Sequence, residues 1–179
     1  MPPTPAIDLN ALRGILGSVV APWVAELQLQ LQEARLGEVV LTLPVTAKHV
    51  HGGGVLCGQS MMAAADTAMI LAVCTHLGEF KPMTTVQLQT SFLRPVPGDA
   101  GEVRVVARVL RMGRKLVFGE IRIDDGRGEL AAQATALGYL DPMLTITGFR
   151  VLPVVARDVL HLGAASFGLM LGAFGIKKR

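Results

Sequence analysis

The stretch KHVHGGGVLCGQSMMAAADTAM, at residues 48–69, combines a glycine-rich segment with a carboxylate, and both residue types could take part in catalysis. Three consecutive glycines at 52–54 would each cost on the order of 1 kcal/mol inside a helix, so a helix here must begin after them. Residues 56–59 would then supply free first-turn amides, which stabilise an oxygen that gains negative charge. Asp66 follows on the same helix, and its carboxylate could take a proton from water or attack a carbonyl carbon.

Hydrophobic periodicity predicts that this helix belongs to an α+β layer design. Apolar residues at 9–20 recur with helical spacing, and Asp8 stands in the capping position. Residues 24–45 alternate with period two, which predicts two strands with one solvent-exposed face. Residues 60–77 are almost all apolar or small, which indicates a buried helix. Four more strand-like runs, separated by turn-forming residues, lie at 83–96, 101–112, 115–124 and 128–140. We expect these four to form an antiparallel meander.

Composition and charge do not favour a nucleic-acid partner. The formal net charge is +3, and the three basic residues at 177–179 account for all of it, so no basic face is indicated. Aromatic residues make up 4% of the chain, too few for base-stacking platforms. Cys57 and Cys74 lie in apolar sequence, and residues 1–10 have neither a basic leader nor an apolar block. We therefore expect a cytoplasmic protein with reduced thiols and no nucleic-acid partner.

From about Glu38 to Leu140 the sequence resembles hotdog-fold thioesterases of the phenylacetate-degradation (PaaI-like) acyl-CoA thioesterase family. AADTAM at 64–69 is similar to the family's helix motif, TTVQLQTSFLRPV at 84–96 to its TVDLNVNFLRP strand, and RMGRKLVFGEIRI at 111–123 to the strand that follows. The resemblance implies a hotdog fold, in which a curved antiparallel sheet wraps around a long central helix. It also implies an acyl-CoA thioesterase that uses no cofactor. We expect this domain to occupy residues 1–140, including the N-terminal helix.

Two glycine-containing turns precede the helix, at 51–54 and at 57–59, and residue spacing decides which of them matches the family motif. The pattern is Asn, then Gly three residues later, His-Gly-Gly after three more, and an acidic residue nine after that His. Counting back nine from Asp66 reaches Cys57, so Cys57-Gly58-Gln59 stands at the His-Gly-Gly. Gly54 then fills the upstream glycine position, and His51 stands where the asparagine would be. The literal His-Gly-Gly-Gly is therefore not the family motif.

On this register the resemblance assigns roles to individual residues. It implies that Asp66 is the general base or nucleophile, that the Gly58 amide is an oxyanion donor, and that the Thr85 hydroxyl lies near the attacking water. His51 could replace the asparagine by donating a hydrogen bond from its imidazole. The other expected substrate-binding residues are Gln59, Cys57, Gly54, Met62, Arg94, Arg114 and Lys115, the last three at strand ends where the family often meets coenzyme A phosphates.

Simpler interpretations of these residues stay open. Asp66 could be hydrogen-bonded to a neighbouring strand, Thr85 could be an ordinary strand residue, and His51 a loop histidine without a role. His49 and His51 form an H-x-H pair, but with no third ligand in view we expect no metal.

The separation of Gly58 and Asp66 predicts a site shared between subunits. Eight residues of helix correspond to roughly 12 Å, too far for one group to hold a carbonyl that the other attacks. In the hotdog family two protomers pack with their helices antiparallel, so that Asp66 of one would face Gly58 of the other. We expect an obligate homodimer with two composite sites, which could pair again into a homotetramer.

Methionine and isoleucine side chains on the helix are expected to line the acyl tunnel. They are Met61, Met62, Met69 and Ile70, and together with the facing strands they would form an adaptable apolar wall. Such a wall suits medium-chain and aromatic acyl groups about equally.

Two other functions compete with thioester hydrolysis. An α/β-hydrolase would use HGGG as its oxyanion loop and GQSMM as its nucleophile elbow, but Met62 stands where the elbow requires a second glycine. A non-hydrolytic acyl-CoA-binding or sensing module would keep the fold without the chemistry. The departures from the family pattern at His51 and Cys57 leave this second alternative open.

Residues 141–179 lie outside the resemblance, and we expect an apolar, helical C-terminal extension. Residues 159–176 carry no formal charge apart from that of a protonated His161, and would extend about 27 Å as a helix. This is the minimum length for crossing a bilayer. Packing on the protein surface and membrane contact are both open interpretations.

Overall fold

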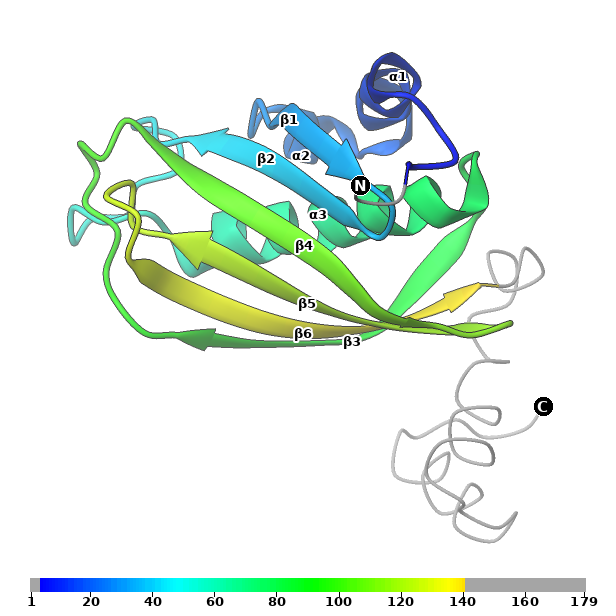
Figure 1. Cartoon of the computed structure of the whole chain (residues 1–179). Coiled ribbons are helices and arrows are strands. Elements are labelled where there is room, and N and C mark those ends of the chain that lie inside the picture. The colour runs from blue at the N-terminus through cyan, green and yellow to red at the C-terminus, as the bar shows by residue number, and fades with distance from the viewer. Residues whose placement is uncertain (1–3, 141–179) are drawn as a thin grey trace, which may run out of the picture. The chain divides into compact units, whose positions relative to one another are not determined.

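The structure, a computed structural model, describes residues 4–140 (Figure 1). The predicted extension at 141–179 lies outside these residues. The elements are, in chain order, α1 (Leu9–Val19), α2 (Pro22–Ala25), β1 (Gln30–Arg35), β2 (Glu38–Pro44), α3 (Gly58–Leu77), β3 (Met83–Phe92), β4 (Glu102–Met112), β5 (Leu116–Asp124) and β6 (Leu130–Leu140). A curved antiparallel sheet crosses α3, which confirms the predicted α+β hotdog fold.

The buried helix α3 begins and ends where local sequence requires it. Cys57 is the N-cap, with extended backbone (φ −72°, ψ 143°), so the glycines at 52–54 precede the helix as predicted. Gly78 ends the helix in the left-handed conformation at φ 75°, and its N–H donates to the Cys74 carbonyl at 3.0 Å. By length and apolar composition α3 could cross a membrane, but 67% of its apolar window is buried inside this fold.

The sheet order differs from the predicted meander. The order is β1-β2-β4-β5-β6-β3, so β3 pairs with β6 at one edge and β4 pairs with β2. Residues 93–101 connect β3 to β4 without a tight hairpin. This connection packs beside the start of α3, where Leu56 N–H donates to the Val96 carbonyl at 2.9 Å. Pro95 and Pro97 lack backbone N–H groups, which also disfavours continuing a ladder here.

The N-terminal elements confirm one prediction and correct another. Asp8 caps α1 by accepting a hydrogen bond from the Ala11 N–H at 2.8 Å, as its position indicated. The alternation over residues 24–45 predicted two strands, but β1 begins only at Gln30, and residues 22–25 form the short helix α2. Gln28 has a φ of 54°, a turn conformation that interrupts an extended strand. In addition, β2 is largely buried on both faces rather than solvent-exposed on one.

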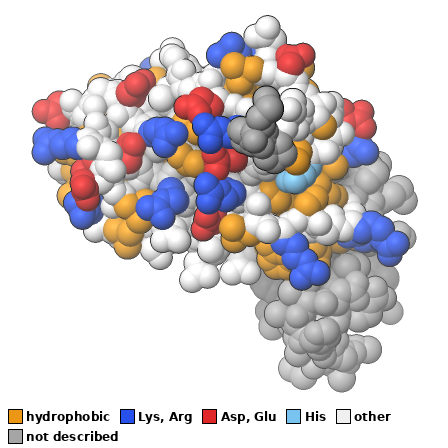
Figure 2. All heavy atoms as spheres, in the orientation of Figure 1, with side chains coloured by type: hydrophobic (Ala, Val, Ile, Leu, Met, Phe, Trp, Pro, Cys, Tyr) orange, Lys and Arg blue, Asp and Glu red, His pale blue; other side chains and the backbone are white. Residues whose placement is uncertain are grey.

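The outer face of the sheet carries charges of both signs. Figure 2 shows basic and acidic side chains intermixed on the face turned to the viewer. Arg108 donates to the Glu38 carboxylate at 2.7 and 2.8 Å, and this carboxylate raises the pKa of Arg108. Arg108 is exposed and Glu38 is half-buried in this cross-strand pair, and ion pairs near the surface typically contribute little to stability.

Candidate functional site

Three free amides mark the N-terminus of α3. The N–H groups of Gly58, Gln59 and Ser60 have no acceptor within residues 4–140, and the first amide that bonds into the helix is that of Met61, to the Cys57 carbonyl at 3.4 Å. The prediction of free amides at 56–59 is therefore correct only at 58 and 59. The Leu56 N–H donates to the Val96 carbonyl at 2.9 Å, and the Cys57 N–H donates to the carbonyl of the buried His49 at 2.8 Å. These bonds fix the backbone that leads into α3. The three free N–H groups of its first turn remain available to stabilise a developing negative charge.

A groove of about 440 Å³ opens beside Gly58. Apolar residues form most of its wall, including Met61 and Phe92, and Arg94 lies among the lining residues. A Cβ atom added to Gly58 would lie 2.9 Å from Cζ of Phe92, so glycine allows the ring to approach the backbone here. Arg94 pairs with Glu129 at 3.3 Å, and both side chains are exposed.

The acidic group of α3 is held by a strand hydroxyl. Oγ1 of Thr85 donates a hydrogen bond to Oδ1 of Asp66 at 2.5 Å. Asp66 is half-buried, and no basic side chain within the described residues forms an ion pair with it. The bond orients the carboxylate and leaves its second oxygen available.

One row of β3 side chains connects Asp66 to Gly58. Phe92, Thr90 and Leu88 stand opposite the buried alanines at 132, 134 and 136 of β6, so they point toward α3. A bulge between Thr85 and Gln87 shifts the register of β3, so the Thr85 side chain also points toward α3. The strand therefore runs antiparallel to the helix, with Thr85 beside Asp66. Sequence reasoning did not identify Phe92 or Thr90, although the alternation in TVQLQTSF contained the signal.

The remaining predicted residues near α3 lie partly in the loop that precedes the helix and partly on the exposed surface of the helix. His51 is exposed at the base of a short loop, next to the Val50–Leu56 bridge, and its N–H donates to the Val55 carbonyl at 3.1 Å. Its Nδ1 accepts from the Gly53 N–H at 2.9 Å. Gly54 has a φ of 77°, a left-handed backbone conformation that favours glycine at this position. Gln59 and Met62 are exposed on α3.

The two cysteines are free thiols with different surroundings. Cys57 is half-buried, and its Sγ lies 3.0 Å from the Ser60 hydroxyl. Cys74 is fully buried in α3, and burial raises its pKa to about 11. Cys74 therefore remains a protonated core residue.

The predicted phosphate-binding residues divide between the two ends of the sheet. Arg94 follows β3, and its N–H donates to the Ala131 carbonyl at 3.1 Å. Arg114 and Lys115 lie in the β4–β5 turn, where the Lys115 carbonyl accepts from the N–H of Leu140 at 2.7 Å. Because Ala131 and Leu140 are at opposite ends of β6, one chain does not bring these basic residues together.

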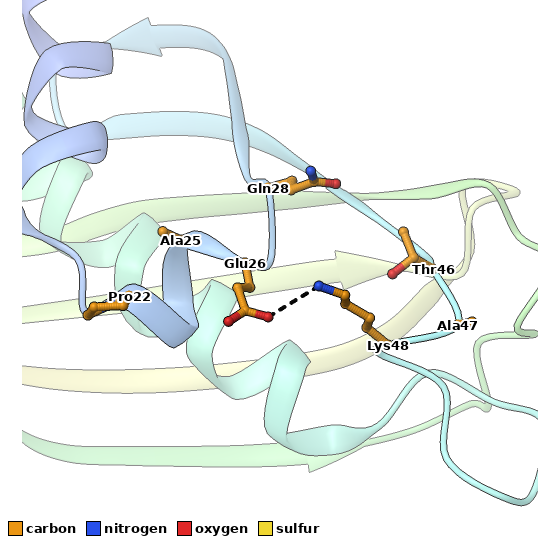
Figure 3. Close-up of a pocket in the computed structure, with 7 residues that line it drawn as sticks. All are labelled: Pro22, Ala25, Glu26, Gln28, Thr46, Ala47 and Lys48. Atoms are coloured by element: carbon orange, nitrogen blue, oxygen red, sulfur yellow. Dashed lines mark hydrogen bonds and ion pairs between the residues drawn. The ribbon is translucent and has the colours of Figure 1, made fainter.

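A larger hollow of about 520 Å³ lies away from these groups (Figure 3). It is formed by α2 and the loop after β2, and the ion pair Glu26–Lys48 crosses it at 3.3 Å. Both charged side chains are well exposed, and neither Asp66 nor the amides of α3 border the hollow. Among residues 4–140, no group of three or more His, Cys, Asp or Glu could hold a metal ion.

Comparison with known proteins identifies relatives over the same region. The thioesterase superfamily pattern matches residues 47–132, which include Asp66 and Thr85. "Putative esterase TV1331" from Thermoplasma volcanium is 28% identical over 114 residues, which cover 64% of this chain and 84% of that protein. "Putative esterase SSO2140" from Saccharolobus solfataricus is 31% identical over 104 residues, covering 58% and 72%. The PaaI protein of the E. coli phenylacetic acid degradation operon has a similar fold, with a TM-score of 0.64 at 20% identity, covering 74% of this chain and 91% of that one.

Proposed function

Because the chain belongs to the thioesterase superfamily, we propose that it hydrolyses the thioester of an acyl-coenzyme A, with a medium-chain or aromatic acyl group. The observation that carries this proposal is the Thr85–Asp66 hydrogen bond on the same helix whose first-turn amides are free. Together these groups provide an oriented carboxylate and an oxyanion site, the two requirements of acyl transfer to water.

The proposed reaction assigns one step to each group. The Gly58 amide and its neighbours bind the thioester carbonyl oxygen and stabilise its charge as the tetrahedral intermediate forms. Asp66 takes a proton from water while the water oxygen bonds to the carbonyl carbon. The carbon–sulfur bond then breaks, and the proton passes to the coenzyme A thiolate. In the nucleophilic variant the carboxylate attacks first, and water hydrolyses the resulting anhydride.

A composite site in a homodimer supports this chemistry better than one chain does. Gly58 and Asp66 are separated by roughly 12 Å along α3. In the described chain the outer edge of β3 is unpaired, and nearby apolar side chains are exposed, namely Met62 at 36%, Phe92 at 49% and Leu93 at 54%. A second copy with its helix antiparallel would cover these side chains and bring its Asp66 to Gly58. Such dimers could pair again into a tetramer.

An assay of thiol release from a panel of acyl-CoA substrates tests the proposal. Turnover of at least one substrate supports hydrolysis. The alternative function is an acyl-CoA-binding module, which the departures from the family pattern at the exposed His51 and at Cys57 favour. Tight acyl-CoA binding without thiol release from any substrate would establish that alternative.

Removing the Thr85 hydroxyl should slow catalysis without weakening substrate binding. Valine has the same shape but cannot donate to Asp66, so we expect Thr85→Val to lower kcat about tenfold with little change in KM. Thr85→Ser keeps the donor and should remain near wild-type activity. Steady-state kinetics of the three proteins check this prediction. If Thr85→Val lowers the melting temperature but not kcat, the bond is only structural.

Charge reversal at the strand ends should reveal where the nucleotide binds. We expect Arg94→Glu or Arg114→Glu to raise KM about tenfold for an acyl-CoA, and much less for an acyl-pantetheine thioester that lacks the nucleotide. Arg122→Glu is the control, because it reverses a charge on the outer face of β5, away from the groove. It should not change KM for the acyl-CoA or for the acyl-pantetheine thioester. Equal effects on both thioesters would show that these arginines do not meet the nucleotide.

A further inference from the structure

A second, enclosed cavity lies between α3 and the sheet. Its wall is apolar apart from two threonines of β3, and it includes Met69 and Ile70 of α3 and Gly138 of β6. Its volume is about 10 Å³, roughly the room for one water molecule. In the free chain this space is therefore almost filled by side chains.

The cavity lies directly behind the proposed catalytic carboxylate. Thr85 both borders the cavity and donates to Asp66. Met69 and Ile70 follow Asp66 by three and four residues, which places them on the same side of the helix one turn further on. The groove beside Gly58 is different, since it is open and includes the charged Arg94. An apolar acyl chain fits the enclosed cavity, whereas an extended polar chain fits the open groove.

Met69 is the cavity residue that is best able to move aside. Its Sδ and Cε atoms reach within 2.3 Å of where a Cβ on Gly119 would lie, so the missing side chain of that strand glycine makes room for the thioether. The side chain is buried, but it is unbranched and has three rotatable bonds. Rotation of Met69 would lengthen the cavity without moving the backbone.

Gly138 offers the opposite change, because a methyl group there would fill the cavity. An added Cβ would meet no atom of residues 4–140 within 4 Å, and the glycine has no positive φ that would strain an alanine. Gly138 stands opposite Thr85 in the β3–β6 ladder, so its Cβ would point toward α3, as the Thr85 side chain does.

We propose that this cavity receives the acyl end of the substrate, and that Met69 and Gly138 set the accepted chain length. The inference rests on the proposed thioesterase function and specifies its substrate as an uncharged, apolar acyl chain that enters by displacing the Met69 thioether. Because the wall offers few polar partners, hydroxylated or charged acyl groups are disfavoured.

The test measures how chain length affects binding and turnover in opposite variants of the full chain. Dissociation constants for S-alkyl coenzyme A thioethers of increasing chain length are measured by calorimetry, and thiol release is measured for the matching acyl-CoA series. Met69→Ala should lengthen the preferred acyl chain by about two or three methylenes, with a gain of about fourfold in affinity for each added methylene. Gly138→Ala should shorten the preferred acyl chain by about one methylene.

Two matched variants control for stability. Leu71→Ala shortens a buried α3 residue that does not border the cavity. Gly14→Ala adds a methyl group to a glycine of α1 whose Cβ would likewise meet no atom of the described part of the chain within 4 Å. Both should keep the wild-type chain-length preference. If Met69→Ala does not fold, Gly138→Ala decides by itself.

The binding and turnover results separate the two proposals. If the wild-type preference persists in Gly138→Ala and in any folded Met69→Ala protein, the cavity does not hold the acyl chain, even where hydrolysis is demonstrated. If thioether affinity shifts as expected but no acyl-CoA is hydrolysed, the cavity assignment stands and the catalytic proposal fails.

Discussion

Asp66→Asn should lower kcat by about a hundredfold or more while leaving the fold intact. Asparagine has the same shape and can still accept the Thr85 hydrogen bond through its Oδ1, but it cannot take a proton from water or attack a carbonyl. Because Asp66 is half-buried and forms no ion pair among the described residues, its neutral replacement should change stability little. Thiol-release kinetics and thermal unfolding measure the two effects.

A second aspartate provides the control for this substitution. Asp99 is exposed in the loop before β4, and Asp99→Asn removes the same charge away from α3. This variant should remain close to wild-type activity. Near-normal turnover by Asp66→Asn would remove Asp66 from the mechanism and leave the hydrogen bond with Thr85 as a structural contact.

Mixing two inactive variants should restore activity if the site is shared between subunits. Gly58→Pro removes one amide donor, and Asp66→Asn removes the carboxylate, so each homodimer should be nearly inactive. A mixed dimer would have one site with both defects and one site with neither. Random reassembly makes half of the dimers mixed, so activity should recover to roughly a quarter of the wild-type value. The measurement is thiol release after mild unfolding and reassembly of an equal mixture.

The structure supports the choice of proline at position 58. Gly58 is the first residue of α3, where proline is tolerated, and the extended backbone of Cys57 is the conformation that favours a following proline. Any side chain at this position must displace the Phe92 ring, which is 49% exposed and can move. Gly58→Ala adds a Cβ but keeps the N–H, and it should retain most activity. An alanine variant as inactive as the proline variant would attribute the loss to Phe92 instead of the amide.

Subunit exchange must be shown before the mixture is interpreted. A wild-type pair with two different affinity tags should form doubly tagged dimers under the same conditions. If these form and the mixture remains as inactive as its components, Gly58 and Asp66 act within one chain, which would exclude the composite site.

Local sequence determined the start of the central helix, but not the neighbours of each strand. The glycines at 52–54 exclude a helix, and the apolar run after Gly58 favours one, so the boundary was predictable. Alternation in β3 indicates a strand, but the same alternation suits an edge strand or a central one. Its pairing with β6 depends on the long connection at 93–101, whose path only the tertiary structure shows.

The candidate site was only partly predictable for the same reason. The residues themselves identified Asp66 as unusual, because a carboxylate in an apolar helix needs a partner or a use. That the partner is Thr85 could not be derived, since 19 residues separate the two and the strand register is shifted by a bulge. Arg94 and Arg114 both follow strand-like runs, yet only the fold shows that they lie at opposite ends of the sheet.

The pairing of β2 with β4 has a consequence for synthesis on the ribosome. β2 ends at Pro44, but β4, its inner neighbour, begins at Glu102. At about 5–20 residues per second, roughly 3–12 seconds pass between the synthesis of these two strands. During this interval the apolar side chains of β2 and the newly made α3 lack the sheet that covers them in the finished protein. The nascent chain therefore passes through an aggregation-prone stage, and its cooperative sheet forms only after most of the domain has left the exit tunnel.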